Sequence, residues 1–243
     1  MKEKSNPLWD GVSAGARAQL SSRNYQAGSL PQRLAGAGVD VAELLATEDR
    51  AGWIPGVEIF ARKVHRQRHR GVFGEFARRE EGVLKRIGLW PAQWATARMF
   101  AGTAKGFHVH PPHVPQGQDA AAWMKELFGK EPANFSKRPY AQEQWDVMFF
   151  VQGVVEMILH ETRAGLEKRT MRFFIDGDNH PGANNAGVVI PAGVAHALRV
   201  ENSEDAIMVY GTSTSFHPEF EGRIASEVES ADLPEGWQKF LGL

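Results

Sequence analysis

From Trp53 onward the chain consists of short apolar or alternating segments that turn residues separate. The first segments are VEIFARKV, GVFGEF, KRIGLW and ATARMF. The later ones are WDVMFFVQGVVEMILHETR, which breaks at Gln152-Gly153 as a hairpin would, and RTMRFFID, GVVIPAG, AHALRV and AIMVYGTS. Short strands at close spacing, without long helices between them, predict an all-β fold: an antiparallel sandwich or barrel.

Two helical segments are predicted beside the strands. Residues 1–52 are small, polar and rich in Gly and Ala, which indicates an N-terminal extension to a domain at 53–243. Asp40 is an acceptable N-cap for a short helix, VAELLA, within that extension. Asp119 is a second N-cap, and the helix after it predicts a helical insertion between strands at about 114–142.

Composition narrows the classes of protein. The chain of 243 residues has no cysteine, which excludes disulfides, thiolate metal sites and cysteine nucleophiles and fits a reducing compartment. The 28 Lys and Arg residues balance 29 Asp and Glu residues, so no net field attracts nucleic acid or an anionic membrane. The start of the chain lacks the apolar run of a signal peptide, and no stretch is long enough to span a bilayer. We therefore expect a soluble, cytoplasmic protein that binds neither nucleic acid nor membrane.

A histidine cluster is the first candidate for chemistry. Residues 102–113 read GTAKGFHVHPPH. In a strand, His108 and His110 lie on one face and Val109 on the other. Paired imidazoles favour a proton-transfer site or a metal site, because imidazole titrates near neutrality and its neutral form binds metals. A polar strand end at the rim of a sheet is the alternative, and it is the favoured interpretation of His113.

A further histidine follows a tight connection in GVVIPAGVAHALRVEN, where Pro191 and Gly193 precede it. His196 shares its strand face with Leu198, so its imidazole is expected to point into the fold. A lone buried histidine is usually a structural residue.

The two histidine segments together resemble the two-motif signature of the cupin superfamily. The patterns are G-x5-H-x-H at 102–110 and P-x-G-x2-H at 191–196. The resemblance implies that a barrel brings both motifs to one cavity. Metal-binding cupins add a glutamate after the first motif, whereas this chain has PPHVPQGQ, so His113, Gln116 or Gln118 would have to replace it.

Longer segments resemble the dTDP-4-dehydrorhamnose 3,5-epimerases. They fall within residues 53–226 and read IPGVEIFARKVHRQRHRGVFGEF, KGFH, IPAGVAHAL and MVYGTSTSFHPEFEGRI. The resemblance implies a double-stranded β-helix, or jelly roll, in a homodimer without a cofactor. It also implies an isomerase of carbohydrate biosynthesis, which epimerises a 4-keto-6-deoxy sugar nucleotide by removing protons beside the ketone and returning them on the opposite face.

The resemblance assigns catalytic roles to three residues. His108 matches the base, and an imidazole suits removal of a proton beside a ketone. His196 matches the other histidine that lines the cavity. Tyr210 matches the acid that protonates the face opposite the base. The alternative for Tyr210 is an ordinary strand aromatic with a hydrogen-bonded hydroxyl.

Four further positions match substrate-binding residues of the family. Arg70 and Glu75 match the R-G-x-F turn and the acidic residue after it, Gln93 matches a glutamine on the next strand, and Lys105 matches an arginine. Arg70 and Lys105 would bind the diphosphate, although a lysine lacks the planar bidentate fork of arginine. Solvated surface charge is the alternative for both.

Asp146 departs from the family pattern. It stands where the family has a lysine that stabilises the enolate, and a carboxylate would repel that enolate. The family also orients its base histidine with a carboxylate. The sequence leaves three candidates for that partner: Glu227, Glu229 and Asp232.

Three interpretations remain open. The first is a metal-free nucleotide-sugar epimerase with His108 as base and Tyr210 as acid. The second is a metal-dependent cupin enzyme in which His108, His110 and His196 hold one divalent cation, with Asp146 or a residue of the insertion as fourth ligand. The third is a non-catalytic sugar or nucleotide binder. His110 discriminates between the first two, because the epimerases typically have glutamine there.

Overall fold

The computed structural model describes residues 38–110, 117–119, 122, 144–163, 165–216, 222–223, 233 and 235–242. The elements in chain order are β1 (Val39–Asp40), α2 (Val41–Ala46), β2 (Glu58–Ala61), β3 (Val64–Arg66), η2 (Arg68–Arg70), β4 (Val72–Gly74), α3 (Gly82–Arg86), β5 (Gln93–Met99), β6 (Ala104–Val109), β7 (Asp146–Gln152), β8 (Val154–Glu161), β9 (Thr170–Asp176), β10 (Ala186–Ile190), β11 (Val194–Val200), β12 (Ala206–Thr212), β13 (Gly222–Arg223) and α5 (Glu235–Leu241).

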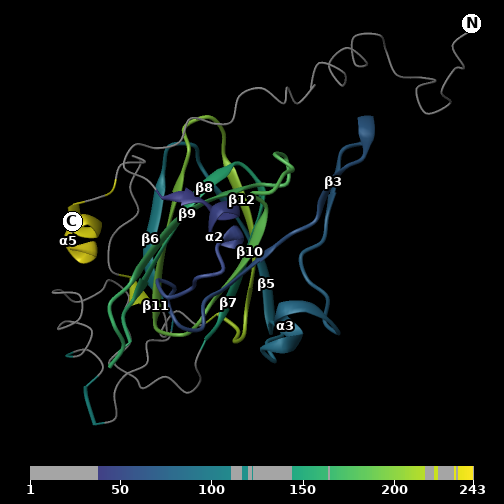
Figure 1. Ribbon diagram of the computed structural model, residues 1–243. Helices are drawn as coiled ribbons and strands as arrows, with labels where there is room; N and C mark the ends of the chain where they lie inside the picture. Colours follow the sequence, from purple (N-terminus) through teal and green to yellow (C-terminus); the bar gives the residue numbers. More distant parts are fainter. Residues whose placement is uncertain are drawn as a thin grey trace, which may run out of the picture.

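Two sheets face each other and form a sandwich (Figure 1). One sheet has the order β1-β9-β8-β11-β6-β13, and the other has the order β2-β10-β7-β12-β5. The described strand pairs are antiparallel except β1 with β9. The predicted all-β, antiparallel jelly-roll class is confirmed, as an open sandwich rather than a closed barrel.

The main core lies between the sheets. Its large side chains include Phe150, Met157, Leu159 and Phe173. The outer faces are covered as well: α5 covers β6 through Trp237 and Phe107, and α3 covers β7 through Leu84 and Phe149. Because several strands are buried on both faces, their sequences read as continuous apolar runs instead of a strict alternation.

Two local predictions are wrong. The break at Gln152-Gly153 is not a hairpin, because β7 and β8 belong to different sheets. Gly153 has a φ of 83°, and there the chain crosses from one sheet to the other. The segment KRIGLW is not a strand, since its first residues complete α3, which buries Leu84 against the five-stranded sheet.

The helix predicted in the N-terminal extension is present as α2. It follows β1, whose parallel pairing with β9 adds it to the six-stranded sheet. The backbone N–H of Gly38 donates to Oε1 of Glu156 at 2.6 Å, and Val41 enters the main core. The domain boundary near residue 52 stays a prediction, although β1 and α2 pack directly on the sandwich.

The predicted insertion lies mostly outside the described residues. Where it is described, the backbone N–H of Ala122 donates to Oδ1 of Asp119 at 2.9 Å, which is the predicted N-cap contact. The candidate carboxylate partners of His108 at positions 227, 229 and 232 also lie outside the described residues.

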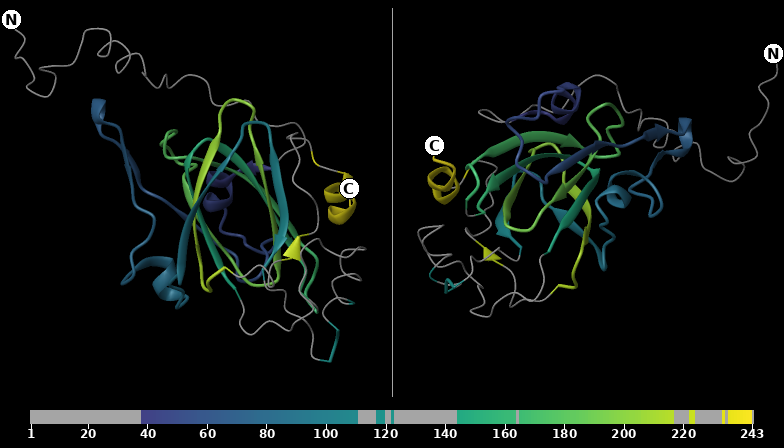
Figure 2. Two further views of the ribbon diagram at one scale, coloured as in Figure 1. Left: turned by 180° about the vertical axis from the view of Figure 1, so that it is seen from behind. Right: turned by 60° about the horizontal axis from the view of Figure 1, so that its bottom comes forward.

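A hairpin made of β3, η2 and β4 projects from the sandwich (Figures 1 and 2). Its tip is η2, which carries Arg68, His69 and Arg70 at exposed positions. Among the helices of the described ranges, none has the length and apolar character needed to cross a membrane.

Candidate active site

A cavity of about 340 Å³ lies between the two sheets. It brings together most of the predicted site residues: Gln93, Lys105, His108, His110, Asp146, His196 and Tyr210. The histidines come from β6, from the residue after β6 and from β11, whereas Asp146 and Tyr210 come from β7 and β12 of the opposite sheet. The cavity therefore has an imidazole wall and a facing wall with a carboxylate and a phenol.

Strand pairing places the two histidine motifs side by side. His196 of β11 lies directly opposite His108 of β6 in the antiparallel register, so both side chains share one face. His110 lies on this face too. Val109 points to the other face and is fully buried in the outer cluster with Trp237. This is the arrangement that strand alternation predicts.

A β-bulge at Gly106 brings Lys105 to the same cavity. The register between β11 and β6 shifts at this point, so Lys105 and His108 line the cavity although they are three positions apart. Gly106 has a φ of 121°, and a Cβ there would lie 2.7 Å from the backbone oxygen of His196. Regular alternation does not predict this shift. The glycine in KGFH is its signal in the sequence.

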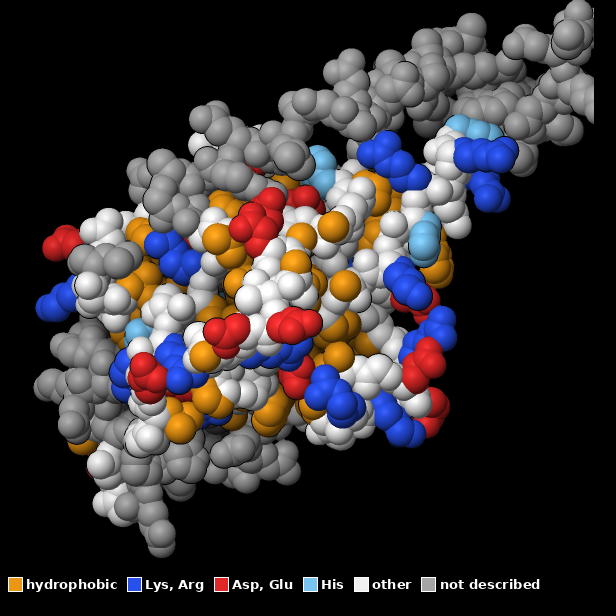
Figure 3. All heavy atoms as spheres, in the orientation of Figure 1, with side chains coloured by type: hydrophobic (Ala, Val, Ile, Leu, Met, Phe, Trp, Pro, Cys, Tyr) orange, Lys and Arg blue, Asp and Glu red, His pale blue; other side chains and the backbone are white. Residues whose placement is uncertain are grey.

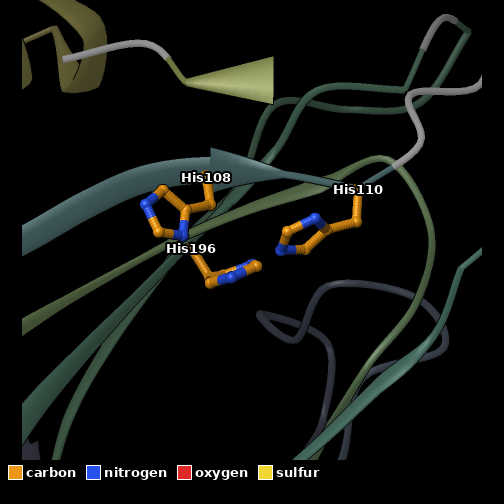
Figure 4. Close-up of side chains that lie close together, drawn as sticks. All are labelled: His108, His110 and His196. Carbon is orange, nitrogen blue, oxygen red and sulfur yellow. The ribbon is translucent and has the colours of Figure 1, made fainter. Parts of the chain in front are cut away.

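The three histidine side chains form one group (Figure 4). The ring centroids of His110 and His196 are 5.0 Å apart, while His108 lies 6.0 Å from His110 and 5.8 Å from His196. One ring nitrogen of each histidine lies within 4.8 Å of the others. Such a group can accept a proton or bind a metal ion.

Asp146 reaches this group from the opposite sheet. Its Oδ2 lies 3.4 Å from Nε2 of His110 and 3.9 Å from Nε2 of His196. Nε2 of Gln144 donates to Oδ1 of Asp146 at 3.0 Å, and the hydroxyl of Thr214 donates to Oε1 of Gln144 at 2.7 Å. Gln144 and Thr214 carry no motif in the sequence, and only the fold reveals that they orient Asp146.

Burial shifts the pKa values of Asp146 and His196. Desolvation raises the pKa of Asp146, against the opposing effects of His196 and Gln144. Desolvation also lowers the pKa of His196 to about 4, assisted by His110 and opposed by Asp146 and by a hydrogen bond with the backbone of Val194. His196 is therefore neutral at physiological pH, which is the form that binds metals.

Tyr210 and Gln93 belong to the facing sheet. Tyr210 lies on β12 between Ala95 of β5 and Met148 of β7, and its side chain is half-buried against the cavity. Oε1 of Gln93 accepts a hydrogen bond from the backbone N–H of Phe216 at 2.9 Å. Phe216 also lines the cavity, and 57% of its surface is exposed.

Arg70 and Glu75 lie away from the cavity lining. Arg70 is at the tip of the projecting hairpin, where Figure 3 shows Lys, Arg and His side chains gathered. Glu75 is exposed and accepts a hydrogen bond from Nε of Arg78 at 2.7 Å. The described part of one chain does not bring these two residues together with the histidines.

No family model matches the chain. The spore coat polysaccharide biosynthesis protein SpsL of Bacillus subtilis (strain 168) is 25% identical over 151 residues, which cover 62% of this chain and 74% of SpsL.

Solved structures share the architecture. A dTDP sugar isomerase from Desulfovibrio desulfuricans G20 superposes with a TM-score of 0.50 and 11% identity, covering 70% of this chain and 84% of that chain. The dTDP-6-deoxy-D-glucose-3,5-epimerase RmlC of Legionella pneumophila Philadelphia 1, in complex with dTDP-4-keto-L-rhamnose, has a TM-score of 0.49 and 20% identity, covering 70% of this chain and 73% of its own. The chain thus has the cupin-like β-sandwich fold seen in the Desulfovibrio isomerase, the fold that its sequence resemblance implies.

Proposed function

We propose that the protein is an isomerase-type enzyme that moves a proton beside a carbonyl group of a sugar nucleotide. One observation carries the proposal. An imidazole, His108, and a phenol, Tyr210, line the same cavity from opposite sheets. A sugar ring bound between them can lose a proton to one wall and regain one from the other, and this inverts the carbon atom.

In the proposed reaction His108 removes the proton next to a ketone, and the electron pair of the broken C–H bond forms an enolate. Tyr210 then donates its phenolic proton to the opposite face of the same carbon. An imidazole is suited to the first step, and positioned acid and base groups each contribute about 10²- to 10⁴-fold in rate. Solvent water restores both groups between turnovers.

The substrate class rests on residues and relatives together. Lys105 adds a positive charge to the cavity wall, where a diphosphate would find a point-charge partner. The Desulfovibrio protein is a dTDP sugar isomerase, and SpsL takes part in spore coat polysaccharide biosynthesis. We propose a dTDP-linked 4-keto deoxysugar as the substrate.

The test is proton exchange in deuterated water. Wild-type protein should incorporate deuterium beside the ketone of dTDP-4-keto-6-deoxyglucose, followed by NMR, and His108→Gln should lower the rate at least about 100-fold. His65→Ala, at an exposed position of β3, should exchange at the wild-type rate. Equal rates in His108→Gln and wild type would refute the assignment of the base. Binding of the nucleotide without exchange would instead indicate a non-catalytic binder.

A homodimer is part of the proposal. β5 ends the described order of the five-stranded sheet, and Trp94 on this strand is 40% exposed with its ring 6.3 Å from that of Trp90. A second copy of the chain would cover such an edge. Light scattering should give about twice the 26.9 kDa of one chain, and the mass of a single chain would contradict a dimer.

A further inference from the structure

We propose that His110, His196 and Asp146 bind a divalent transition-metal cation beside His108. The three side chains line the cavity from both of its walls, and Oδ2 of Asp146 lies close to Nε2 of each imidazole. The catalytic role of the cation rests on the function proposed above.

The spacing of the ligand atoms fits a cation. Bonds of about 2.0–2.2 Å to nitrogen and oxygen place neighbouring ligand atoms about 3.0–3.5 Å apart. Oδ2 of Asp146 lies 3.4 Å from Nε2 of His110 and 3.9 Å from Nε2 of His196. A movement of a few tenths of an ångström closes the longer distance. Two imidazoles and one carboxylate are ligands that Zn²⁺, Fe²⁺ and Mn²⁺ accept, with open positions left for substrate.

The burial of these groups also favours a bound cation. The side chains of Asp146 and His196 are 4% and 5% exposed, and that of His110 is 11% exposed. Burying a carboxylate costs free energy unless a positive charge or hydrogen-bond donors compensate it. A divalent cation would compensate Asp146 and use the lone pairs of both imidazoles.

The surroundings of Asp146 orient it for this role. Gln144 donates to Oδ1, which leaves Oδ2 directed at the two imidazoles, and Thr214 fixes the amide of Gln144 in turn. Ligating carboxylates in metal sites are commonly held by such outer hydrogen bonds, which also set the direction of the lone pair.

His108 stands at the edge of this set. The centroid of its ring is 5.8 Å from that of His196 and 6.0 Å from that of His110, against 5.0 Å between the other two (Figure 4). In this proposal His108 acts as the base and not as a ligand. A cation next to the base would stabilise the negative charge on the enolate oxygen. A lysine in place of Asp146 would provide a positive charge for the same purpose.

The test measures binding directly. Protein freed of metal with a chelator is titrated with Co²⁺ and with Zn²⁺, followed by the visible absorption of bound Co²⁺ and by calorimetry. Wild type should bind one equivalent. His110→Gln and Asp146→Asn should each weaken binding at least about tenfold, because each loses one of three ligands. His65→Ala should bind as wild type, and circular dichroism should show that every variant is folded.

His108→Gln decides the ligand set. It should keep its affinity for Co²⁺ within about threefold of wild type while it loses proton exchange, since the proposal makes His108 a base and no ligand. Loss of affinity as large as in His110→Gln would overturn this assignment in favour of a three-imidazole site. Failure of wild type to bind Co²⁺ or Zn²⁺ more tightly than Asp146→Asn would overturn the metal site altogether.

The metal site and the proposed function can be refuted independently of each other. Stoichiometric binding without proton exchange on any sugar nucleotide would retain the site and refute the function. Exchange that a chelator leaves unchanged, in protein that binds no metal, would retain the function and refute the site. Asp146→Lys distinguishes a metal-binding cavity from a metal-free one. If the cavity binds a metal, the variant should lose both metal binding and proton exchange. A gain in proton exchange would show a metal-free site that lacked a cation.

Discussion

Asp146 on one sheet of the sandwich contacts His110, which directly follows β6 of the other sheet, with Oδ2 of the carboxylate 3.4 Å from Nε2 of the imidazole. The contact crosses the cavity instead of running along a strand. The two walls of the cavity are therefore coupled through this contact. A substitution at either residue removes a polar partner from the opposite wall.

Tyr210→Phe should separate proton removal from inversion. The variant keeps the ring of Tyr210 in the cavity but lacks the phenolic proton, so epimerised product should fall at least about 100-fold. His108 can still remove a proton and return it to the same face, so deuterium uptake should continue. NMR of the recovered sugar measures both quantities. A parallel loss of uptake and product would show that Tyr210 acts in proton removal.

Gly106→Ala should destabilise the protein and disturb the site together. A Cβ at this position would lie 2.7 Å from the backbone oxygen of His196, and the φ of 121° is itself strained for alanine. We expect a loss of about 1–3 kcal/mol in the free energy of unfolding, measured in urea, together with slower proton exchange.

Gly71→Ala is the matched control for that change. Gly71 has a φ of 127°, but a Cβ there would meet no atom within 4 Å. Its loss of stability should be smaller. Equal losses would mean that backbone strain, and not the contact with His196, decides the effect.

Glu156→Gln should be among the most destabilising single changes. Glu156 is fully buried and accepts hydrogen bonds from Nε of Arg199 at 2.5 Å and Nε of Arg172 at 3.2 Å. Removing its charge leaves the guanidinium of Arg199 buried without this negative charge, which costs about 3–5 kcal/mol. Chemical denaturation measures the loss. Glu167→Gln, whose pair with Arg169 is exposed, should change stability by less than about 0.5 kcal/mol.

Stability should fall in mild acid partly because of His160. Burial lowers the pKa of this residue to about 4, assisted by Lys168 and opposed by Glu161. The unfolded chain, with a histidine pKa of about 6.5, binds more protons between these values. The free energy of unfolding is therefore highest above pH 6.5 and falls as the pH drops toward 4.

His160→Gln tests this assignment and retains a polar partner for Thr170, which His160 contacts through Nδ1 at 2.8 Å. Its melting temperature should drop less than that of wild type between pH 7 and pH 5. His65→Gln, at an exposed position, should follow wild type. Parallel curves for His160→Gln and wild type would assign the acid sensitivity to other groups.

The sequence predicts the fold well because glycine and proline mark the turns and the apolar runs between them are strand-length. It predicts the face shared by His108 and His110 because strand alternation has a period of two residues. It misses the crossing at Gly153, since a turn between paired strands and a turn between two sheets use the same residue types.

The candidate site is predictable where motifs mark it and unpredictable where it depends on packing. Gln144 and Thr214 act on Asp146 through side-chain hydrogen bonds, and no spacing in the sequence reveals such contacts. Arg70 lies at the tip of the projecting hairpin and Glu75 directly after it, and their predicted role in substrate binding stays a prediction.

The C-terminal helix has a bearing on the cavity that it never touches. The indole N–H of Trp237 donates to the backbone oxygen of Gly106 at 3.0 Å, behind the bulge that sets the direction of Lys105 and His108. Phe107, on the same outer face, packs against the ring of Trp237. Proteolytic removal of α5 would therefore remove the support of the β6 backbone on the face opposite the histidines. Cleavage far from the substrate would then abolish activity while the sandwich stays folded.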